Sequence, residues 1–328
     1  MTSLKLTAYF AERERAGSRF LADAMFDLFA QRKVATSVML RGISGFGHQR
    51  IIRTDQSLTL SEDPSVTVVA VDTEDTIAAL AGDVLALTRS GLITLERARF
   101  VGEDTPASDA VKLTVYVGRN RTLDGLPAYK AVCELLHRNG FDGASAFLGV
   151  DGTAHGQRRR ARFIARNTDV PMMIVAVGAP DQVSRTVAEL DAMMDSPLMT
   201  LERVRLCKHA APPVLPDADE HGRPLWQKLM ITTSEADRHD GLPIHRALVR
   251  RLWQAGTASG ATVLRGVWGF HDGREPHGDK LFQYGRHVPV TTIVIDSPSR
   301  IAASFAIVAE VTDGRGSVTA EMVPALVA

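Results

Sequence analysis

The sequence has few of the features that mark several large classes of protein. Its 2 cysteines, Cys133 and Cys207, form no CxxC pair, so no disulfide framework is indicated and a reducing compartment is expected. No apolar run approaches the roughly 18 residues of a membrane-spanning helix, and no signal-peptide core follows the N-terminus. The 38 basic residues balance the 38 acidic ones, which argues against a protein that coats nucleic acid. We therefore expect a cytoplasmic protein without a nucleic-acid partner.

What the sequence does contain is a glycine motif that occurs three times, at 41–48, 148–155 and 265–271. Each occurrence is an apolar run, a glycine, two residues, a second glycine and a histidine close behind. It ends a strand-like run and begins a polar loop. This periodicity predicts a repeat protein, and we expect its function where the copies meet.

The repeat divides the chain into three copies and two linkers. The copies span 1–101, 109–207 and 225–328, and the linkers span 102–108 and 208–224. Both linkers are rich in Pro, Ala and Asp, as connecting segments usually are.

Hydrophobic periodicity predicts the same element order, βαββαβ, in each copy. In the first copy period-2 and period-3.6 patterns alternate. The predicted elements are strand Lys5–Phe10, helix Phe20–Arg32, strands Thr36–Arg41 and Val66–Val71, helix Thr73–Arg89 and strand Leu92–Phe100. Such a unit folds as a four-stranded antiparallel sheet with both helices on one face, the ferredoxin-like plait. The predicted class is α+β.

The sheet face without helices carries a lysine and a glutamate in every copy. Because the first and fourth strands of the plait are neighbours, the expected cross-strand pairs are Lys5 with Glu96, Lys112 with Glu202, and Lys228 with Glu321. Three half-polar faces favour packing around a pseudo-threefold axis within one chain, which gives a monomeric pseudo-trimer. Three separate domains on a string are the alternative. The recurrence of the Lys–Glu pairs in all three copies fits an architectural role better than a catalytic one.

The chain also resembles a known family. The glycine motif, the helix start Asp240–Pro243 and the strand Leu92–Glu96 together resemble the PII-like family catalogued as domain of unknown function 190. The resemblance covers nearly the whole chain apart from the linkers. The second copy departs from it, with Leu148 where the other two copies have arginine.

The resemblance implies a plait that assembles as a trimer and carries a long loop between its second and third strands. PII proteins bind adenine nucleotides between subunits, and that loop responds by docking on a partner such as a transporter. Genes of this sub-family often lie beside genes of fluoride channels, so an ion channel is a second possible partner. We expect a sensor of a small anionic ligand, most simply an adenine nucleotide. It would signal through the loops Ser44–Ser65, Asp151–Val170 and Trp268–Val288. Because the three copies have diverged, only one or two of the clefts between them need still bind the ligand.

The candidate ligand site follows from the glycines, whose N–H groups can approach an anion while arginines add charge. The candidate residues are Arg41, Gly42, Gly45, Gly47, His48, Arg53, Gly149, Gly152, Arg265, Gly266 and Gly269. The alternative is that the glycines only serve a strand exit or a bulge. A basic run in the second copy is a candidate docking loop, or simply a solvated loop: Arg158, Arg159, Arg160 and Arg162.

No catalytic residue or cofactor is assigned, because no Ser-His-Asp or Cys-His set has a placement signal, and we expect no enzyme. His48, His155 and His271 recur at similar positions and could meet on a threefold axis to bind a metal. No copy adds a second ligand at clear spacing, so no metal is assigned. The alternatives are a metal-binding or structural adaptor like the divalent-ion tolerance protein CutA, and a hydrolase acting between copies.

Overall fold

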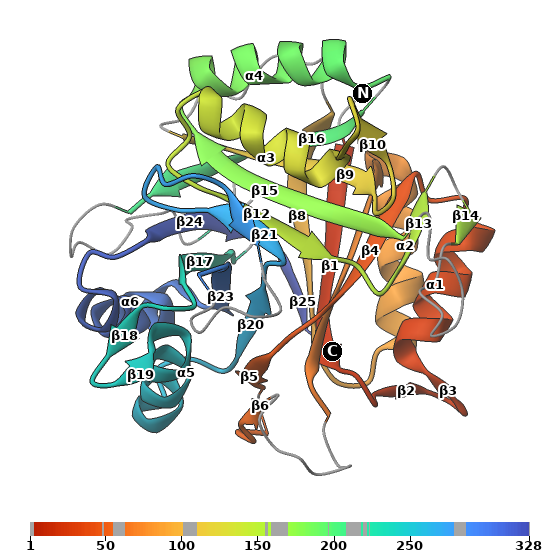
Figure 1. The fold of residues 1–328 in the computed structure, drawn as a ribbon. Coiled ribbons are helices and arrows are strands. Elements are labelled where there is room, and N and C mark those ends of the chain that lie inside the picture. The colour runs from red at the N-terminus through yellow and green to blue at the C-terminus, as the bar shows by residue number, and fades with distance from the viewer. Residues whose placement is uncertain are drawn as a thin grey trace.

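The computed structural model describes most of the chain (Figure 1). The described residues are 3–47, 49–54, 63–100, 110–154, 157–158, 170–195, 197–207, 218, 222, 224–278 and 287–327. They form six helices and many antiparallel strands in three repeated α+β units. Among them, no helix combines the length and the apolar character that crossing a bilayer requires.

The first copy runs through ten elements. They are β1 (Ser3–Ala11), β2 (Arg15–Ala16), β3 (Arg19–Phe20), α1 (Leu21–Gln31), β4 (Thr36–Arg41), β5 (Ser44–Phe46), β6 (Arg53–Thr54), β7 (Ser65–Thr73), α2 (Glu74–Leu87) and β8 (Leu92–Phe100).

The second and third copies repeat this order. The second copy has β9 (Ala110–Gly118), β10 (Thr122–Leu123), β11 (Leu126–Pro127), α3 (Ala128–Arg138), β12 (Ala144–Leu148), β13 (Asp151–Ala154), β14 (Gln157–Arg158), β15 (Pro171–Gly178), α4 (Pro180–Met193) and β16 (Leu198–Leu206). The third has β17 (Trp226–Ser234), β18 (Arg238–His239), β19 (Leu242–Pro243), α5 (Ile244–Ala255), β20 (Ala261–Arg265), β21 (Trp268–Phe270), β22 (His277–Gly278), β23 (Pro289–Asp296), α6 (Pro298–Thr312), β24 (Ser317–Val323) and β25 (Ala325–Val327).

The helices begin and end close to where the sequence predicts them. Helix α2 starts after Thr73, whose side chain accepts a hydrogen bond from the backbone N–H of Thr76, and two acidic residues follow in its first turn. Helix α5 ends at Ala255 and is capped by Gly256, which has φ +67° and is therefore left-handed. One prediction was wrong: the starts of the three expected loops are short strands, β5, β13 and β21.

Within each copy the four long strands form one antiparallel sheet. In the first copy β1 pairs with both β7 and β8, and β4 pairs with β7, so the order is β4-β7-β1-β8. The equivalent orders are β12-β15-β9-β16 and β20-β23-β17-β24. The predicted pairing of the first and fourth strands is confirmed, including Lys5 opposite Glu96.

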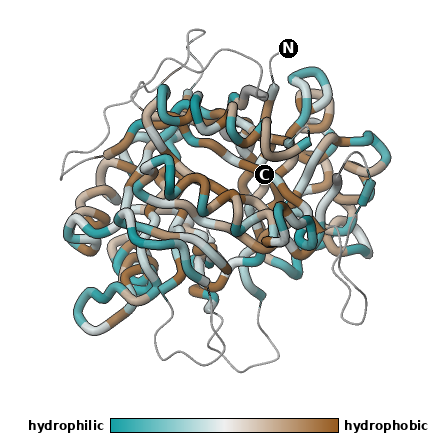
Figure 2. The backbone as a smooth tube through the Cα atoms, turned by 45° about the horizontal axis from the view of Figure 1, so that its top comes forward, coloured by the Kyte–Doolittle hydropathy of each residue, from teal (hydrophilic) through white to brown (hydrophobic). Residues whose placement is uncertain are grey.

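Each copy has its own hydrophobic core between its helices and its sheet. In the first copy Leu6, Ala8 and Phe10 of β1 pack against α1 and α2, as their alternation predicts. A fourth cluster lies where the three sheets meet and draws side chains from every copy, including Val71, Phe147 and Leu264. Figure 2 shows the hydrophobic segments concentrated inside the molecule. The faces without helices are therefore covered by one another.

The last strands of the copies join in a closed cycle. Strand β8 pairs with β16 at Phe100 and Thr200, and β16 pairs with β24 at Arg205 and Ala320. Strand β25 then returns to β8, where it pairs with Leu92–Thr94. Each copy is thus hydrogen-bonded to both of the others.

Candidate functional site

Six charged side chains meet at the centre of the three sheets, and we call them the axial ion ring. They are Lys5, Lys112, Lys228, Glu96, Glu202 and Glu321. Each lysine contacts the glutamate of its own copy and that of the next copy, so positive and negative charges alternate around the ring. The nearest N–O distances include 2.9 Å for Lys112–Glu202, 2.7 Å for Lys112–Glu321 and 3.0 Å for Lys228–Glu96. Lys5 also contacts Glu202, which closes the cycle.

The ring is buried and internally neutral. Burial opposes the charged form of each lysine, but attraction to the neighbouring glutamates outweighs it and raises the pKa of all three. Burial likewise opposes ionisation of Glu96 and Glu321, and the lysines nonetheless hold the pKa of both carboxyls below its ordinary value. Carboxylate oxygens of the three glutamates converge within 4.8 Å, a spacing that suits a metal. Three ammonium groups already compensate their charge, so we assign the ring an architectural role.

Three similar contacts, which we call joints, connect each copy to its neighbour. In joint 1–3 strand β5 pairs with β20, in joint 2–1 β13 pairs with β4, and in joint 3–2 β21 pairs with β12. The residue after the first motif glycine donates its N–H to the neighbouring copy in every case. These bonds are Ile43 to Val263 (2.9 Å), Val150 to Met39 (2.9 Å) and Val267 to Ala146 (2.8 Å).

The second glycine of each motif is required by the close approach of the neighbouring backbone. A Cβ atom at Gly45 would lie 2.4 Å from the carbonyl oxygen of Ala261. The corresponding distance is 2.3 Å for Gly152 and 2.1 Å for Gly269. These contacts are shorter than real Cβ atoms allow, so a side chain here would push two copies apart. A Cβ atom at Gly149 would similarly lie 2.1 Å from the carbonyl oxygen of Pro171.

Gly42 and Gly266 use their N–H groups within the sheet and do not offer them to an anion, which corrects the expectation for these two glycines. Gly42 donates to the carbonyl oxygen of Ser65 at 2.7 Å, and Gly266 donates to that of Pro289 at 2.8 Å. Both bonds belong to the sheet, because each extends the pairing of the second strand with the third.

The two motif arginines are held by carboxylates of their own copies. Arg41 lies 2.8 Å from Glu12, and Arg265 lies 2.9 Å from Glu235. The second copy, with Leu148 in place of the arginine, has Arg119 in place of the glutamate, so it lacks both members of the pair. Neither motif arginine is among the residues that line the cavity described below.

The docking candidate Arg158 is engaged inside the chain. Its guanidinium lies 2.8 Å from Asp23, 2.5 Å from Asp27 and 2.6 Å from Asp151. Two of these carboxylates belong to α1 of the first copy, so Arg158 fastens joint 2–1. The candidates Arg159, Arg160, Arg162, His48 and His155 lie outside the described residues.

Joint 1–3 contains a cavity of about 680 Å³ between the first and third copies. This volume is within the usual range for small-ligand sites. Of the ligand-binding candidates, Gly45, Gly47 and Arg53 line it. The wall segment that includes Gly47 and Arg53 is held on α5 because the indole N–H of Trp253 donates to the carbonyl oxygen of Arg50 at 2.6 Å.

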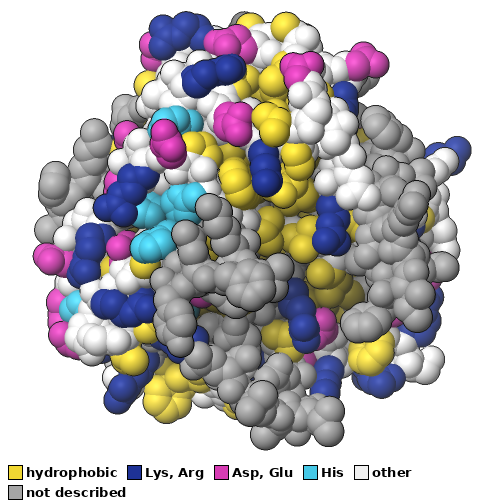
Figure 3. Space-filling view, in the orientation of Figure 1, with side chains coloured by type: hydrophobic (Ala, Val, Ile, Leu, Met, Phe, Trp, Pro, Cys, Tyr) yellow, Lys and Arg dark blue, Asp and Glu magenta, His cyan; other side chains and the backbone are white. Residues whose placement is uncertain are grey.

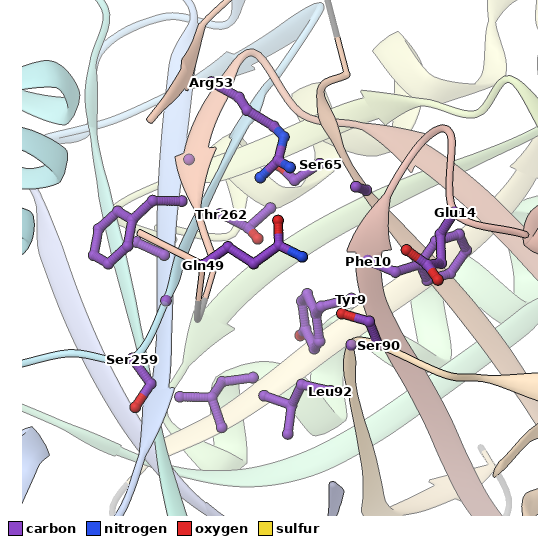
Figure 4. A pocket seen from close by; sticks show the side chains of 18 of the residues that line it. Tyr9, Phe10, Glu14, Gln49, Arg53, Ser65, Ser90, Leu92, Ser259 and Thr262 are labelled. Carbon is purple, nitrogen blue, oxygen red and sulfur yellow. The ribbon is translucent and has the colours of Figure 1, made fainter. Parts of the chain in front are cut away.

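The cavity has a polar side and an apolar side. Figure 4 shows Arg53 and Gln49 extending into it from one side, with Tyr9 and Leu92 across from them. The Arg53 guanidinium is 3.7 Å from the Asp63 carboxylate, a distance longer than a normal hydrogen bond. Sequence reasoning missed most of the apolar wall, which is built from Leu92, Trp226, Ile293 and Ile295. In the sequence, the one indication of these four residues is that they lie on or beside strands, on the sheet face that carries no helices.

Comparison with known proteins identifies the repeat. A curated "UPF0166 protein" of Aquifex aeolicus (strain VF5) is 36% identical over 73 residues, which cover 22% of this chain and 69% of that protein. A crystal structure of aspartate kinase from Synechocystis aligns with 97% of this chain and 43% of its own, at 13% identity and a TM-score of 0.29, too low to support an argument. The profile of the family DUF190 (Uncharacterized ACR) matches residues 3–100, 110–206 and 226–325. The chain therefore belongs to the DUF190 family and carries three tandem copies of its domain.

Proposed function

We propose that the chain is a regulatory ligand-binding protein built as an intramolecular pseudo-trimer of three ferredoxin-like plaits. Its ligand site is the cavity of joint 1–3, and an adenine nucleotide is the first ligand to test. The proposal rests mainly on that cavity, which two copies build together and which combines an apolar wall with a polar side at Arg53 and Gln49. A planar, apolar body with a polar or anionic group fits this division.

The proposed signal passes through the loop whose two ends line the cavity. The segment 44–65 contributes Gly45, Gly47 and Arg53 to the cavity, so a ligand there contacts the base of the long loop. We propose that occupancy changes how this loop presents itself to a partner, with a membrane transporter or channel as the kind of partner to examine. The protein acts in this scheme as a sensor and not as an enzyme.

Asymmetry between the copies supports a single site. A Cβ atom at Gly47 would meet nothing within 4 Å, whereas the third copy has a buried histidine, His271, at the corresponding place. In joint 2–1 the Arg158 ion pairs fasten β14 to α1. We therefore propose one ligand per chain.

A thermal-shift screen tests the proposal with ATP, ADP, AMP, cyclic nucleotides and S-adenosylmethionine, each with and without Mg²⁺. A ligand that binds only the folded chain adds about 2.7 kcal/mol of stability at a hundredfold excess over its Kd. The variant Gly47→Leu adds an apolar side chain at the cavity wall and should abolish the shift, whereas Gly82→Leu, on the exposed surface of α2, should retain it. A shift that survives in Gly47→Leu would place the ligand elsewhere, and no shift with any of these compounds would remove adenine nucleotides from consideration.

A further inference from the structure

Joint 3–2 repeats the geometry of the joint that holds the cavity. Gly269 pairs with His277 across the hairpin of β21 and β22, as Gly45 pairs with Arg53 across the hairpin of β5 and β6. His277 therefore occupies the position of Arg53, the cationic residue of the cavity.

Two further positions correspond in the same way. A Cβ atom at Gly143 would lie 3.5 Å from the Cα atom of His271, and one at Gly260 would lie 3.5 Å from the Cα atom of Gly47. His271 thus takes the place of Gly47. His287 stands two residues before β23, as Asp63 stands two residues before β7.

The first copy lines its cavity with glycine, arginine and aspartate at these three positions, and the third copy has histidine at all three. The sequence contains only 10 histidines, so three at matched positions of one joint are not expected from composition alone. The rings are also close together. The centroids of His271 and His277 are 6.1 Å apart, and those of His277 and His287 are 6.2 Å apart. Figure 3 shows several histidine side chains near one another on this face of the molecule, with another lying apart from them.

His271 has the arrangement of a metal ligand with an outer partner. Its Nδ1 lies 3.0 Å from a carboxylate oxygen of Asp272, which accepts a hydrogen bond from the Nδ1–H group. Its Nε2 is buried and has no hydrogen-bond partner among the described residues, and the whole residue is only 4% exposed. A carboxylate on one ring nitrogen that leaves the other nitrogen free to coordinate is the usual pattern around metal-bound histidine.

We propose that His271, His277 and His287 bind one divalent transition-metal ion of the Zn²⁺ class, with Asp272 orienting His271. Imidazole suits zinc, nickel and copper, and three protein ligands leave one position for water. The Nδ1 of His277 now lies 2.9 Å from the carbonyl oxygen of Glu275, and its Nε2 lies 2.8 Å from that of His287. Coordination therefore requires the His277 ring to rotate and to release one carbonyl. The site is separate from the ligand cavity and does not depend on its function.

The test uses the full chain without an affinity tag, stripped of metal with EDTA and titrated with Co²⁺ and then Zn²⁺. We expect one equivalent of Co²⁺ with the strong visible absorption of a four-coordinate site, displaced by Zn²⁺. His277→Gln and His271→Gln should each weaken Co²⁺ binding by at least about tenfold, and Asp272→Asn by roughly 10- to 100-fold. His239→Gln, in the β18–β19 hairpin of the same copy, should bind like wild type.

Circular dichroism in EDTA shows whether each variant folds. His271 is buried, so if His271→Gln does not fold, the His277→Gln variant still tests the proposal. Two results would overturn the proposal. One is a wild-type chain that takes up less than one equivalent of Co²⁺ at micromolar concentration, and the other is a folded His277→Gln variant with wild-type affinity. Loss of binding in His155→Gln would also contradict it, because the metal would then lie among the motif histidines of different copies.

Discussion

Replacement of Lys112 by methionine tests the axial ion ring most sharply. Lys112 is 2% exposed and lies within 3 Å of both Glu202 and Glu321. Methionine has nearly the same length and no charge, so the packing changes little. The ring is then left with two ammonium groups and three carboxylates, and one buried negative charge has no partner.

The expected loss of stability at pH 7 is about 3 kcal/mol. Removing one member of a buried ion pair costs about 3–5 kcal/mol. The loss of stability has an upper limit, because the unpaired glutamate can take up a proton instead of staying charged. Raising its pKa from about 4.5 to 7 corresponds to about 3.4 kcal/mol at about 1.36 kcal/mol per unit. For 328 residues the average unfolding entropy converts 3 kcal/mol into a fall of about 4 °C in Tm.

The pH dependence identifies the cause. In the variant one glutamate has a raised pKa, so the folded chain binds more protons than the unfolded chain below neutral pH, and its stability rises as the pH falls toward 5. In wild type the pKa of Glu96 and Glu321 is lowered, so their contribution is constant above about pH 4.5 and is lost only below it. The difference between the two proteins should therefore shrink by about 2–3 kcal/mol between pH 7 and pH 5.

Urea unfolding of both proteins at pH 7 and pH 5 measures this difference. The exposed pair Arg32–Asp83, at 2.7 Å, supplies the control, and Arg32→Met should change stability by less than about 1 kcal/mol at either pH. The combined change Lys112→Met with Glu321→Gln restores neutrality and should be more stable than Lys112→Met alone. A loss below about 1 kcal/mol for Lys112→Met, or one that does not vary with pH, would refute the argument.

Three further predictions concern single residues. Arg53→Ala should weaken ligand binding at least tenfold, whereas Arg41→Ala, outside the cavity, should leave it unchanged in a calorimetric titration. Gly152→Val should lower the Tm by several degrees or prevent folding, because its Cβ would lie 2.3 Å from the Ser37 carbonyl oxygen. Burial, and after it three nearby arginines, lowers the pKa of His245 to about 4, so the unfolded chain binds the extra proton as the pH falls. Wild-type stability in urea should therefore fall by up to about 3 kcal/mol from pH 6.5 to 4, and His245→Gln should flatten this decline.

The sequence was sufficient for the repeats, the class and the pairing of the first strand with the fourth. Side chains alternate along a strand with a period of two, so Leu6 and Ala8 could be assigned to the helix-covered face and Lys5 to the opposite one. The alternation is a local pattern. The long-range pairing of the first strand with the fourth followed because a lysine and a glutamate recur at the same places in every copy.

The partners between copies could not be predicted in the same way. Lys5 contacts Glu202, 197 residues away, and only the packing of three sheets brings them together. The close contacts of the second glycines were hidden for a related reason. The sequence left Gly45 and Gly152 either to approach an anion or to serve a strand exit, and only the packing of the copies shows that neighbouring carbonyl oxygens exclude a side chain there.

The location of the cavity was equally hidden. A cavity depends on the size of the side chain at matching positions of the three joints. The first copy has Gly47 at one such position, and the third copy has the buried His271 there. That equivalence emerges only from the pairing of β5 with β20 and of β21 with β12.

The most direct test of the proposed function is the stoichiometry of ligand binding, measured by isothermal titration calorimetry with the best compound from the screen. The account predicts one ligand per chain for wild type and for Gly82→Leu, and no binding to a folded Gly47→Leu variant. Three ligands per chain, or one ligand still bound by Gly47→Leu, would contradict a single site in joint 1–3.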